Sequence, residues 1–439
     1  MISTFINAWK IADLRKKMLF TALIVLIFRI GAAIPVPFTE ITGSITPENS
    51  ESFFNYLSMM TGDAFNYGTI FAMGVTPYIN SSIIIQLLAV AIPALEKLSK
   101  EGEEGRKKMA TITRYTTIAL AVMQSTAYFI YLRSQGYVVK DASGQLFTGF
   151  SAVLQGLVII LVLTAGSAFV MWLGEQVNDK GIGNGVSIIL FAGIVARMPT
   201  LCTQMYSYLT TGKKGYYALV PIVVICLLAM IAYIVWMDNA ERRIPVQYAK
   251  RVVGRKMYGG QSTYIPIKVN MSGVLPVIFA SSILSLPATV KLFLQNKELS
   301  SFWTGFFKWF STDHWFYAIL YFLLILFFAY FYASIQYNPV EMANNIRKNS
   351  GMVPGIRPGK PTSDYIKKIL SRITLLGALL LSVVALFPNI LTIFTKLIKY
   401  PMAVSLGGTS LIIVVGVALE TVKQLESQMM MRHYKGFLD

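Results

Sequence analysis

The sequence predicts an all-α, polytopic membrane protein whose ten transmembrane helices form two inverted halves of five. The 439 residues are 55% hydrophobic and only 14% charged, so a water-soluble fold could not keep the apolar surface away from solvent. Ten apolar runs are long enough to cross a hydrocarbon layer of about 30 Å as helices. Basic residues are abundant in alternate connections between these runs, which is typical of a multi-span membrane protein.

The ten predicted spans follow one another along nearly the whole chain. Span one follows Arg15, Lys16 and Lys17, but no small-residue cleavage pattern comes after it, so we expect a retained helix. In chain order the spans cover residues 18–36, 70–95, 115–132, 152–173, 183–198, 217–237, 274–293, 314–335, 369–387 and 402–419.

Lysine and arginine are distributed unevenly over the connections. The N-terminus, the even-numbered connections and the C-terminal tail hold 27 of the 39, whereas the odd-numbered connections hold 8. The remaining four lie within the spans, at Arg29, Arg197, Lys291 and Arg372. Because basic residues are retained on the cytoplasmic side, we expect both termini in the cytoplasm.

The ten spans divide into five and five at the connection 199–216, which we interpret as an external hinge loop. An odd number of spans per half places the second half in the opposite orientation to the first. Inverted repeats of this kind are typical of proteins whose working site lies between the halves. The predicted units are residues 1–198, the hinge 199–216, residues 217–419 and a cytoplasmic tail 420–439.

The chemistry of the spans excludes several classes of function. None of the 21 acidic residues lies inside a span, whereas proton-coupled carriers usually keep an intramembrane acid or histidine. No nucleophile with a base is visible, so we do not expect an enzyme. Cys202 and Cys226 share no motif spacing, and His314 and His433 lie far apart, so we expect no disulfide, metal site or cofactor.

Polar and aliphatic residues share one side of the helix predicted for span two. On a helical wheel, Val75, Ile79, Ser82 and Gln86 fall within about 60° of one another, and Asn80 lies alongside. Asn80, Ser82 and Gln86 either hold neighbouring helices together or form an edge that meets water or a substrate.

Other groups within the spans are also unusual. Gly74 and Pro77 would let the start of span two separate from the preceding segment. Arg29 is the one charge deep in a span; we interpret it as a side chain that reaches the interface or bonds to nearby carbonyl groups, with a role in a transport pathway as the alternative. Span seven has two prolines and three serines, Ser281, Ser282 and Ser285.

Two long basic connections, 238–273 and 336–368, face the predicted cytoplasm. In the first, strand-like stretches 244–253 and 262–269 flank "GRKMYGG", which predicts a hairpin with Arg255 and Lys256 at its tip. The second is rich in glycine and proline, which predicts a stiff, turn-rich arm around Arg357. These arms either dock on a polyanion or an acidic protein surface, or are solvated loops that only set topology.

Long stretches of the chain resemble the SecY family of protein-conducting channels. The stretches are "FAMGVTPYINSSIIIQLL", "MWLGEQVNDKGIGNGVSIILFAGIVA", "YAKRVVGRKMYGGQSTYIPIKVNMSGVLPVIFASSIL", "VPGIRPGKPT" and "GGTSLIIVV", in the order in which that family has them. The resemblance extends from span one to span ten. It implies a clamshell of two five-helix halves that encloses an hourglass pore.

The resemblance also implies four functional features. It implies a lateral gate between spans two and seven, a plug within residues 53–66, and a cytosolic docking surface on the two basic arms. The pore ring would consist of Val75, Ile79, Val186, Leu190, Ile278 and Ile413. The plug would include Met59, Met60 and Phe65, the gate Asn80, Ser82, Gln86, Ser281, Ser282 and Ser285, and the docking surface Arg251, Arg255, Lys256 and Arg357.

The function implied by the resemblance is protein transport across the bacterial plasma membrane. Unfolded, signal-bearing polypeptides would pass through the pore, and transmembrane segments would leave sideways into lipid. The implied partners are SecE and SecG as small membrane subunits, the SecA ATPase, and a ribosome whose RNA meets the basic arms. The alternatives are a small-solute secondary carrier and a lipid flippase or transferase, although the paired carboxylates of the latter are not visible.

Overall fold

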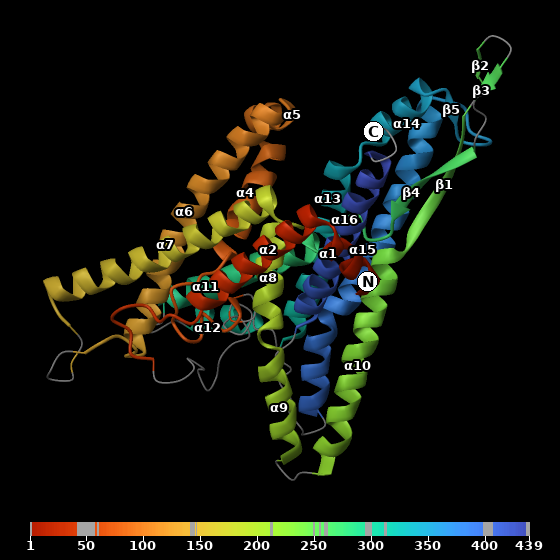
Figure 1. Cartoon of the computed structure of the whole chain (residues 1–439). Coiled ribbons are helices and arrows are strands. Elements are labelled where there is room, and N and C mark those ends of the chain that lie inside the picture. Colours follow the sequence, from red (N-terminus) through yellow and green to blue (C-terminus); the bar gives the residue numbers. More distant parts are fainter. Residues whose placement is uncertain are drawn as a thin grey trace.

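The protein is built mainly from long helices, as the computed structural model shows (Figure 1). A small region of β-strands projects from one end of the molecule, which we call the sheet end. The structure describes residues 2–41, 58, 61–140, 145, 147–210, 214–248, 251–253, 256–258, 262–294, 301–310, 314–397 and 407–435.

The helices follow the order of the predicted spans. Those up to residue 210 are α1 (Ile2–Lys10), α2 (Ala12–Gly31), α4 (Thr76–Ala91), α5 (Pro93–Lys100), α6 (Glu103–Ser134), α7 (Phe150–Lys180), α8 (Gly185–Val195) and α9 (Met198–Thr210). The later ones are α10 (Lys214–Asn239), α11 (Leu275–Leu294), α12 (Ser301–Trp309), α13 (Trp315–Gln336), α14 (Pro339–Lys348), α15 (Lys360–Leu397) and α16 (Gly408–Lys435).

Every predicted span coincides with a helix. Among the described residues, six helical stretches are long and apolar enough to cross a membrane, or seven if α4 and α5, which are bent by 108°, count as one. The six are Phe150–Lys180, Gly185–Thr210, Gly215–Asn239, Trp315–Lys348, Lys360–Leu391 and Gly408–Met430. The other three predicted spans correspond to α2, α6 and α11, and α11 contributes the shorter apolar stretch Leu275–Leu284. The predicted all-α membrane fold is confirmed.

The helix of span two begins later than the sequence suggests. Residues 61–75, which we call the irregular segment, consist mainly of turns, and α4 starts only at Thr76. Gly74 has a φ of +52°, a left-handed conformation that glycine adopts without steric cost. Pro77 lies in the first turn of α4, where its missing N–H removes no helical hydrogen bond. The predicted separation of α4 from the preceding segment is confirmed.

Helices α7 and α8 cross at very short distance. The side chain of Asn184 caps α8 by accepting a hydrogen bond from Ser187 N (3.3 Å), and Gly185 N donates to Asn178 Oδ1 (2.7 Å). A Cβ atom on Gly185 would lie 1.9 Å from the carbonyl oxygen of Gly174. The crossing therefore requires glycine at position 185. Beyond α8, the connection predicted as a loop over 199–216 is largely helical, because α9 continues to Thr210 and α10 begins at Lys214.

The predicted hairpin is confirmed and is longer than a simple pair of strands. Strand β1 (Glu241–Tyr248) pairs antiparallel with β4 (Ser262–Lys268), from Glu241 opposite Lys268 to Gln247 opposite Ser262. Strands β2 (Arg251–Val253) and β3 (Lys256–Tyr258) pair at the outer end. Buried Val246 and Ile267 pack in one cluster with Ile346 of α14, so the base of the hairpin is anchored to the helices.

The second basic connection is more ordered than predicted. Its first part is α14, because Asn338 accepts hydrogen bonds from Val340 N (3.1 Å) and Glu341 N (3.4 Å) and Pro339 occupies the first turn. Strand β5 (Gly351–Met352) then pairs with β1. The two arms, which the sequence suggests are separate, therefore share one sheet, and the turn-rich stretch is limited to the residues just before α15.

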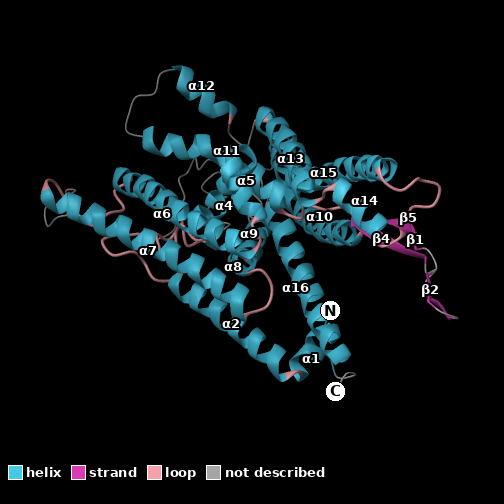
Figure 2. Ribbon diagram, turned by 90° about the horizontal axis from the view of Figure 1, so that it is seen from above, coloured by secondary structure: helices cyan, strands magenta, loops and turns pink. Residues whose placement is uncertain are grey.

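The helices before and after α9 meet along a continuous apolar core. Helix α8 packs against α16, and α11 packs against α6 and touches α4. A single cluster of buried side chains includes residues from α2, α4, α7 and α8 and from α10, α11, α13, α15 and α16. Near the chain ends, α1 packs beside α16 (Figure 2), and Thr4 Oγ1 donates a hydrogen bond to Glu426 Oε1 (3.1 Å).

We predict that Gly185→Ala destabilises the protein by about 1–3 kcal/mol, because the added methyl group would overlap the carbonyl of Gly174 and separate α7 from α8. Thermal unfolding of the detergent-solubilised protein measures this effect. Gly305→Ala in α12 is the matched control, since its Cβ would meet no atom within 4 Å. Equal melting temperatures for the two variants would contradict the close crossing.

Candidate functional site

The six predicted ring residues lie in one apolar region of the structure. They come from the start of α4 and from α8, α11 and α16. Five of them are buried, and Val186 is partly buried against the same cluster. The five buried residues are Val75, Ile79, Leu190, Ile278 and Ile413. The structure thus brings together aliphatic side chains that are far apart in the sequence.

A cavity of about 500 Å³ lies next to three of these residues. Leu190, Ile278 and Ile413 line it together with polar groups from the last turn of α10, the end of β4 and α16. The charged groups in its lining are Asp238, Lys268, Glu420 and Lys423. Because both signs of charge are present, the cavity has no strong preference for cations or anions. It combines an aliphatic region with a wall of polar and charged side chains near the base of the sheet.

Helix α4 is connected to α13 through Gln86. The hydroxyl of Tyr332 donates to Gln86 Oε1 (2.5 Å), while Gln86 Nε2 donates to Ser82 Oγ (3.1 Å). Asn80 Oδ1 is buried and has no hydrogen-bond partner among the described residues. Of the three predicted polar residues of span two, Gln86 therefore bonds to another helix, Ser82 bonds to Gln86 within α4, and Asn80 has an acceptor oxygen without a partner among the described residues.

The serines of span seven behave differently from the polar residues of α4. Ser281 Oγ donates to the carbonyl of Ile278 in its own helix (2.9 Å). The side chain of Ser285 lies outside the described residues. Tyr332 was not predicted; its ring packs edge-on against Phe279 of α11, with centroids 5.3 Å apart. The tyrosine thus contacts both α4 and α11. Nothing in the sequence distinguishes it from the other tyrosines of span eight, Tyr317, Tyr321 and Tyr330.

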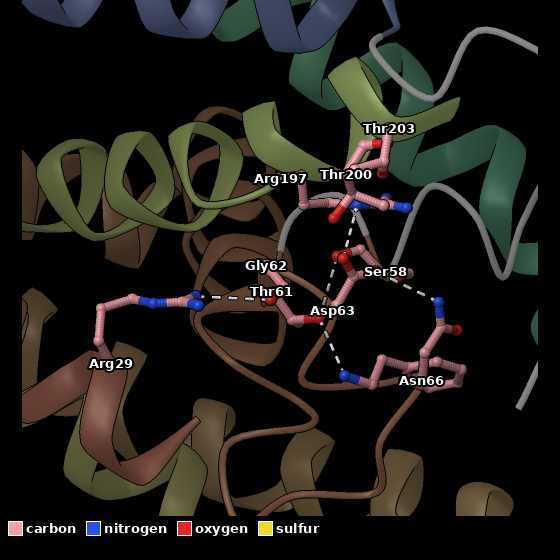
Figure 3. A network of polar contacts seen from close by, with 10 residues as sticks. Arg29, Ser58, Thr61, Gly62, Asp63, Asn66, Arg197, Thr200 and Thr203 are labelled. Carbon is pink, nitrogen blue, oxygen red and sulfur yellow. Dashed lines mark hydrogen bonds and ion pairs between the residues drawn. The ribbon is translucent and has the colours of Figure 1, made fainter. Parts of the chain in front are cut away.

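The predicted plug position overlaps the start of the irregular segment. Met59 and Met60 lie outside the described residues, whereas Phe65 is buried and its carbonyl accepts a hydrogen bond from the Tyr128 hydroxyl (2.6 Å). Arg29 Nη1 donates to the carbonyl of Gly62 (3.5 Å), which confirms that Arg29 bonds to a carbonyl group. The segment is therefore held by side chains from two neighbouring helices. Figure 3 shows the contact from Arg29 to Gly62.

Gly62 and Asp63 form a tight turn in this segment. Their φ angles are +65° and +69°, and such consecutive left-handed residues favour glycine, asparagine and aspartate. A Cβ atom on Gly62 would lie 2.8 Å from the carbonyl oxygen of Gly193 in α8. The turn therefore packs directly on the backbone of α8, next to the α8 residues assigned to the ring.

Three of the four predicted docking residues are described, and their backbones lie at the sheet end. Arg251 opens β2 and Lys256 opens β3, while Arg255 lies outside the described residues. Arg357 is exposed, and its carbonyl accepts a hydrogen bond from Thr362 Oγ1 (2.8 Å), which fixes the backbone at the start of α15. On β1, the hydrogen bond from Arg243 Nε to Glu241 Oε1 (2.7 Å) raises the pKa of Arg243 above its ordinary value. Arg243 therefore keeps its charge at any physiological pH.

Among the described residues, no group of three or more histidine, cysteine, aspartate or glutamate side chains has the arrangement of a metal site. The long apolar helices define a polytopic membrane protein, and its aliphatic cluster adjoins a partly polar cavity.

Comparison with known proteins identifies the family. The SecY family profile matches residues 69–422. Protein translocase subunit SecY of Streptomyces scabiei is 44% identical over 449 positions, and that of Mycobacterium bovis is 42% identical over 453 positions; both alignments cover all of this chain and all of the relative. The chain belongs to the SecY family. This confirms the resemblance and gives no support to a small-solute carrier.

Solved structures share the fold at low sequence identity. A protein-conducting channel superposes with a TM-score of 0.65 at 18% identity, covering 94% of this chain and 92% of that one. Sec61 from a canine ribosome–channel complex gives a TM-score of 0.62 at 17% identity, with the same coverage. The arrangement of helices described above is therefore the one found in that class of channel.

We predict that Tyr332→Phe and Gln86→Leu are energetically coupled, because each removes one side of the same interhelical hydrogen bond. A double-mutant cycle on the free energy of unfolding should give a coupling of about 0.6–2 kcal/mol. Tyr330→Phe is the control, since the hydroxyl of Tyr330 donates to the carbonyl of Ser371 and should show no coupling to Gln86. A coupling near zero for the Tyr332 pair would mean that α4 and α13 are not linked in this way.

Proposed function

We propose that this chain is the channel subunit of a protein translocase in the bacterial plasma membrane. It passes unfolded, signal-bearing polypeptides across the bilayer and releases transmembrane segments sideways into lipid. The observation that supports this most directly is the cavity of about 500 Å³, which is lined by Leu190, Ile278 and Ile413. These residues belong to the aliphatic cluster where the helices before α9 meet the helices after it. Membership of the SecY family supports the same conclusion.

The aliphatic ring is the seal of the proposed pore. A narrow apolar constriction closes by expelling water, so ions do not cross it at rest. Aliphatic side chains offer no specific hydrogen bond, so the ring accepts any residue of a passing chain. This indifference to sequence is what a general protein conduit requires.

The proposed lateral gate lies where α4 meets α11 and α13. The link between Gln86 and Tyr332 contributes about 0.6–2 kcal/mol, and a guest helix or water can replace it. A signal sequence with about ten leucine-like residues gains roughly 3–6 kcal/mol on entering lipid. This gain is sufficient to shift a gate whose two states differ by a few kcal/mol. The unpaired Asn80 Oδ1 supports the gate assignment because it offers an acceptor to an incoming segment.

The sheet end is proposed to face the cytoplasm, together with both termini. Support comes from the 27 basic residues assigned to that side and from the joining of both basic arms in one sheet. We propose that Arg251, Arg255, Lys256 and Arg357 dock either a SecA-type ATPase or ribosomal RNA. Among the fold neighbours are Sec61 and yeast Ssh1, both in complexes with ribosomes.

Small membrane subunits of the SecE and SecG type are proposed as further partners. Helix α10 leaves a largely apolar surface uncovered, since only 22% of its most apolar stretch is buried. Tyr217, Ile225, Leu228 and Trp236 are exposed there. Lipid or single-span subunits would cover this face in the membrane.

We predict that proteoliposomes containing this protein, its small subunits and a SecA-type motor import a signal-bearing precursor when ATP is added. Protease protection of the precursor measures import, and liposomes without the protein provide the control. A stalled precursor should crosslink to probes at positions 79 and 278, because both residues belong to the proposed ring. Ion-driven uptake of a small solute without precursor import would instead favour a carrier.

We predict that Arg357→Glu abolishes motor-driven import, because it reverses an exposed charge on the proposed docking surface. The variant should still insert into the membrane, since its side chain makes no buried contact. Lys140→Glu carries the same charge change at an exposed site in an odd-numbered connection and should import normally. Unchanged import with Arg357→Glu would remove this residue from the docking surface.

A further inference from the structure

A buried ion pair connects the irregular segment to the junction between α8 and α9. Arg197 lies between these two helices, and its Nε is 3.1 Å from Asp63 Oδ2. The two side chains are only 9% and 18% exposed. The two residues are far apart in the sequence, and Figure 3 shows them facing each other at the centre of a polar network.

Asp63 also organises its own segment. Its Oδ1 accepts hydrogen bonds from Ser58 Oγ (2.7 Å) and from Asn66 Nδ2 (3.3 Å). One oxygen of the Asp63 carboxylate therefore accepts hydrogen bonds from residues on both sides of the turn, and the other oxygen pairs with Arg197. Any movement of this turn away from α8 must separate the carboxylate from the guanidinium.

The environment makes that separation difficult when the interior is dry. Removing one partner of a buried pair is strongly unfavourable, because the other charge stays desolvated. The second contact to a cation is weaker, since Arg29 reaches only the carbonyl of Gly62 at 3.5 Å. Among the described polar contacts, the Asp63–Arg197 pair is thus the main electrostatic attachment of this turn to α8 and α9.

The guanidinium of Arg197 also has hydrogen-bonding groups without partners among the described residues, so water could compete with Asp63 for it. Arg197 Nε and Nη1 are both buried and neither has a hydrogen-bond partner among the described residues, so the contact with Asp63 is a charge–charge contact without a hydrogen bond. Water that enters an open pore would supply hydrogen-bond partners to these nitrogens and would screen the attraction to Asp63. The attachment is therefore strongest in a dry, closed interior and weakest in a wet, open one.

We propose that the Asp63–Arg197 ion pair is a lock that holds the turn against α8 and sets how apolar a signal must be to open the channel. This proposal rests on the proposed channel function. Both residues act by positioning the turn. In the locked position the turn packs on the backbone of α8 beside the aliphatic ring, so its release would uncover this part of α8.

The test compares Asp63→Asn, Arg197→Gln and the double variant in proteoliposomes. The readouts are resting ion leak and import of two precursors, one with a strong and one with a weakened signal. Each single variant should raise the leak by roughly tenfold or more and should import the weak-signal precursor, which the wild type rejects. Because the residues act as a pair, the double variant should leak about as much as either single one and less than the product of the two effects.

Two controls separate loss of the lock from other effects. Glu40→Gln removes an exposed acid from the same predicted external connection and should behave like the wild type. Arg197→Lys keeps the positive charge and should leak much less than Arg197→Gln. This comparison decides the question even if Asp63→Asn does not fold.

The results that would overturn the lock differ from those that would overturn the channel function. Wild-type leak and wild-type rejection of the weak signal in both single variants would overturn the lock, although import itself would continue. Equal leak in Arg197→Lys and Arg197→Gln would also overturn it. If the wild-type protein imports no precursor at all, the proposed function fails.

Discussion

The irregular segment imposes the central physical constraint, because it places non-helical backbone among membrane helices. In a hydrocarbon environment each unpaired N–H or C=O group costs several kcal/mol, so such backbone persists only where the protein bonds to it. Tyr128 donates to the carbonyl of Phe65, and Ser167 Oγ donates to the carbonyl of Gly74 (3.3 Å). The surrounding helices must therefore carry polar groups at fixed positions, and this explains why the interior of an otherwise apolar bundle contains a polar network.

The attachment of this segment changes in character along its length. Near α4 it consists of neutral hydrogen bonds, such as Ile70 N to the carbonyl of Ile34 (3.0 Å) and the Ser167 hydroxyl to the carbonyl of Gly74. Near Asp63 it depends on charged side chains from elsewhere in the chain, chiefly Arg197. Neutral hydrogen bonds to backbone groups are hard to exchange inside a bundle, whereas charged groups are readily hydrated. The part nearest α4 is thus the fixed end, and the turn at residues 62–63 is the end that moves under the proposed mechanism.

The sequence predicted the features that depend on composition and local pattern. Apolar length located every span, and the strand–turn–strand pattern located the hairpin, because both signals are contained in contiguous residues. Helix α14 was not predicted, although Asn338 followed by Pro339 and Glu341 is a typical helix start, because the glycines and prolines later in the same connection indicate turns. The Asp63–Arg197 contact and the link from Tyr332 to Gln86 could not be predicted, because pairing across the bundle depends on tertiary packing that a single sequence does not reveal. The sequence alone shows only that Arg197 is a charge within a span, and it does not identify the partner of that charge.

Water weakens both the aliphatic seal and the proposed Asp63–Arg197 lock, and this makes them parts of one proposed switch. A narrow apolar constriction expels water, and a dry interior strengthens the attraction between Asp63 and Arg197. A dry interior in turn keeps the turn packed on α8, which keeps the constriction narrow. Once a guest segment widens the constriction, water enters and the ion pair weakens. The turn is then less strongly attracted to its position on α8 while the pore is occupied. Each element stabilises the state that the other favours, so intermediate openings are disfavoured and the channel is expected to be either sealed or open.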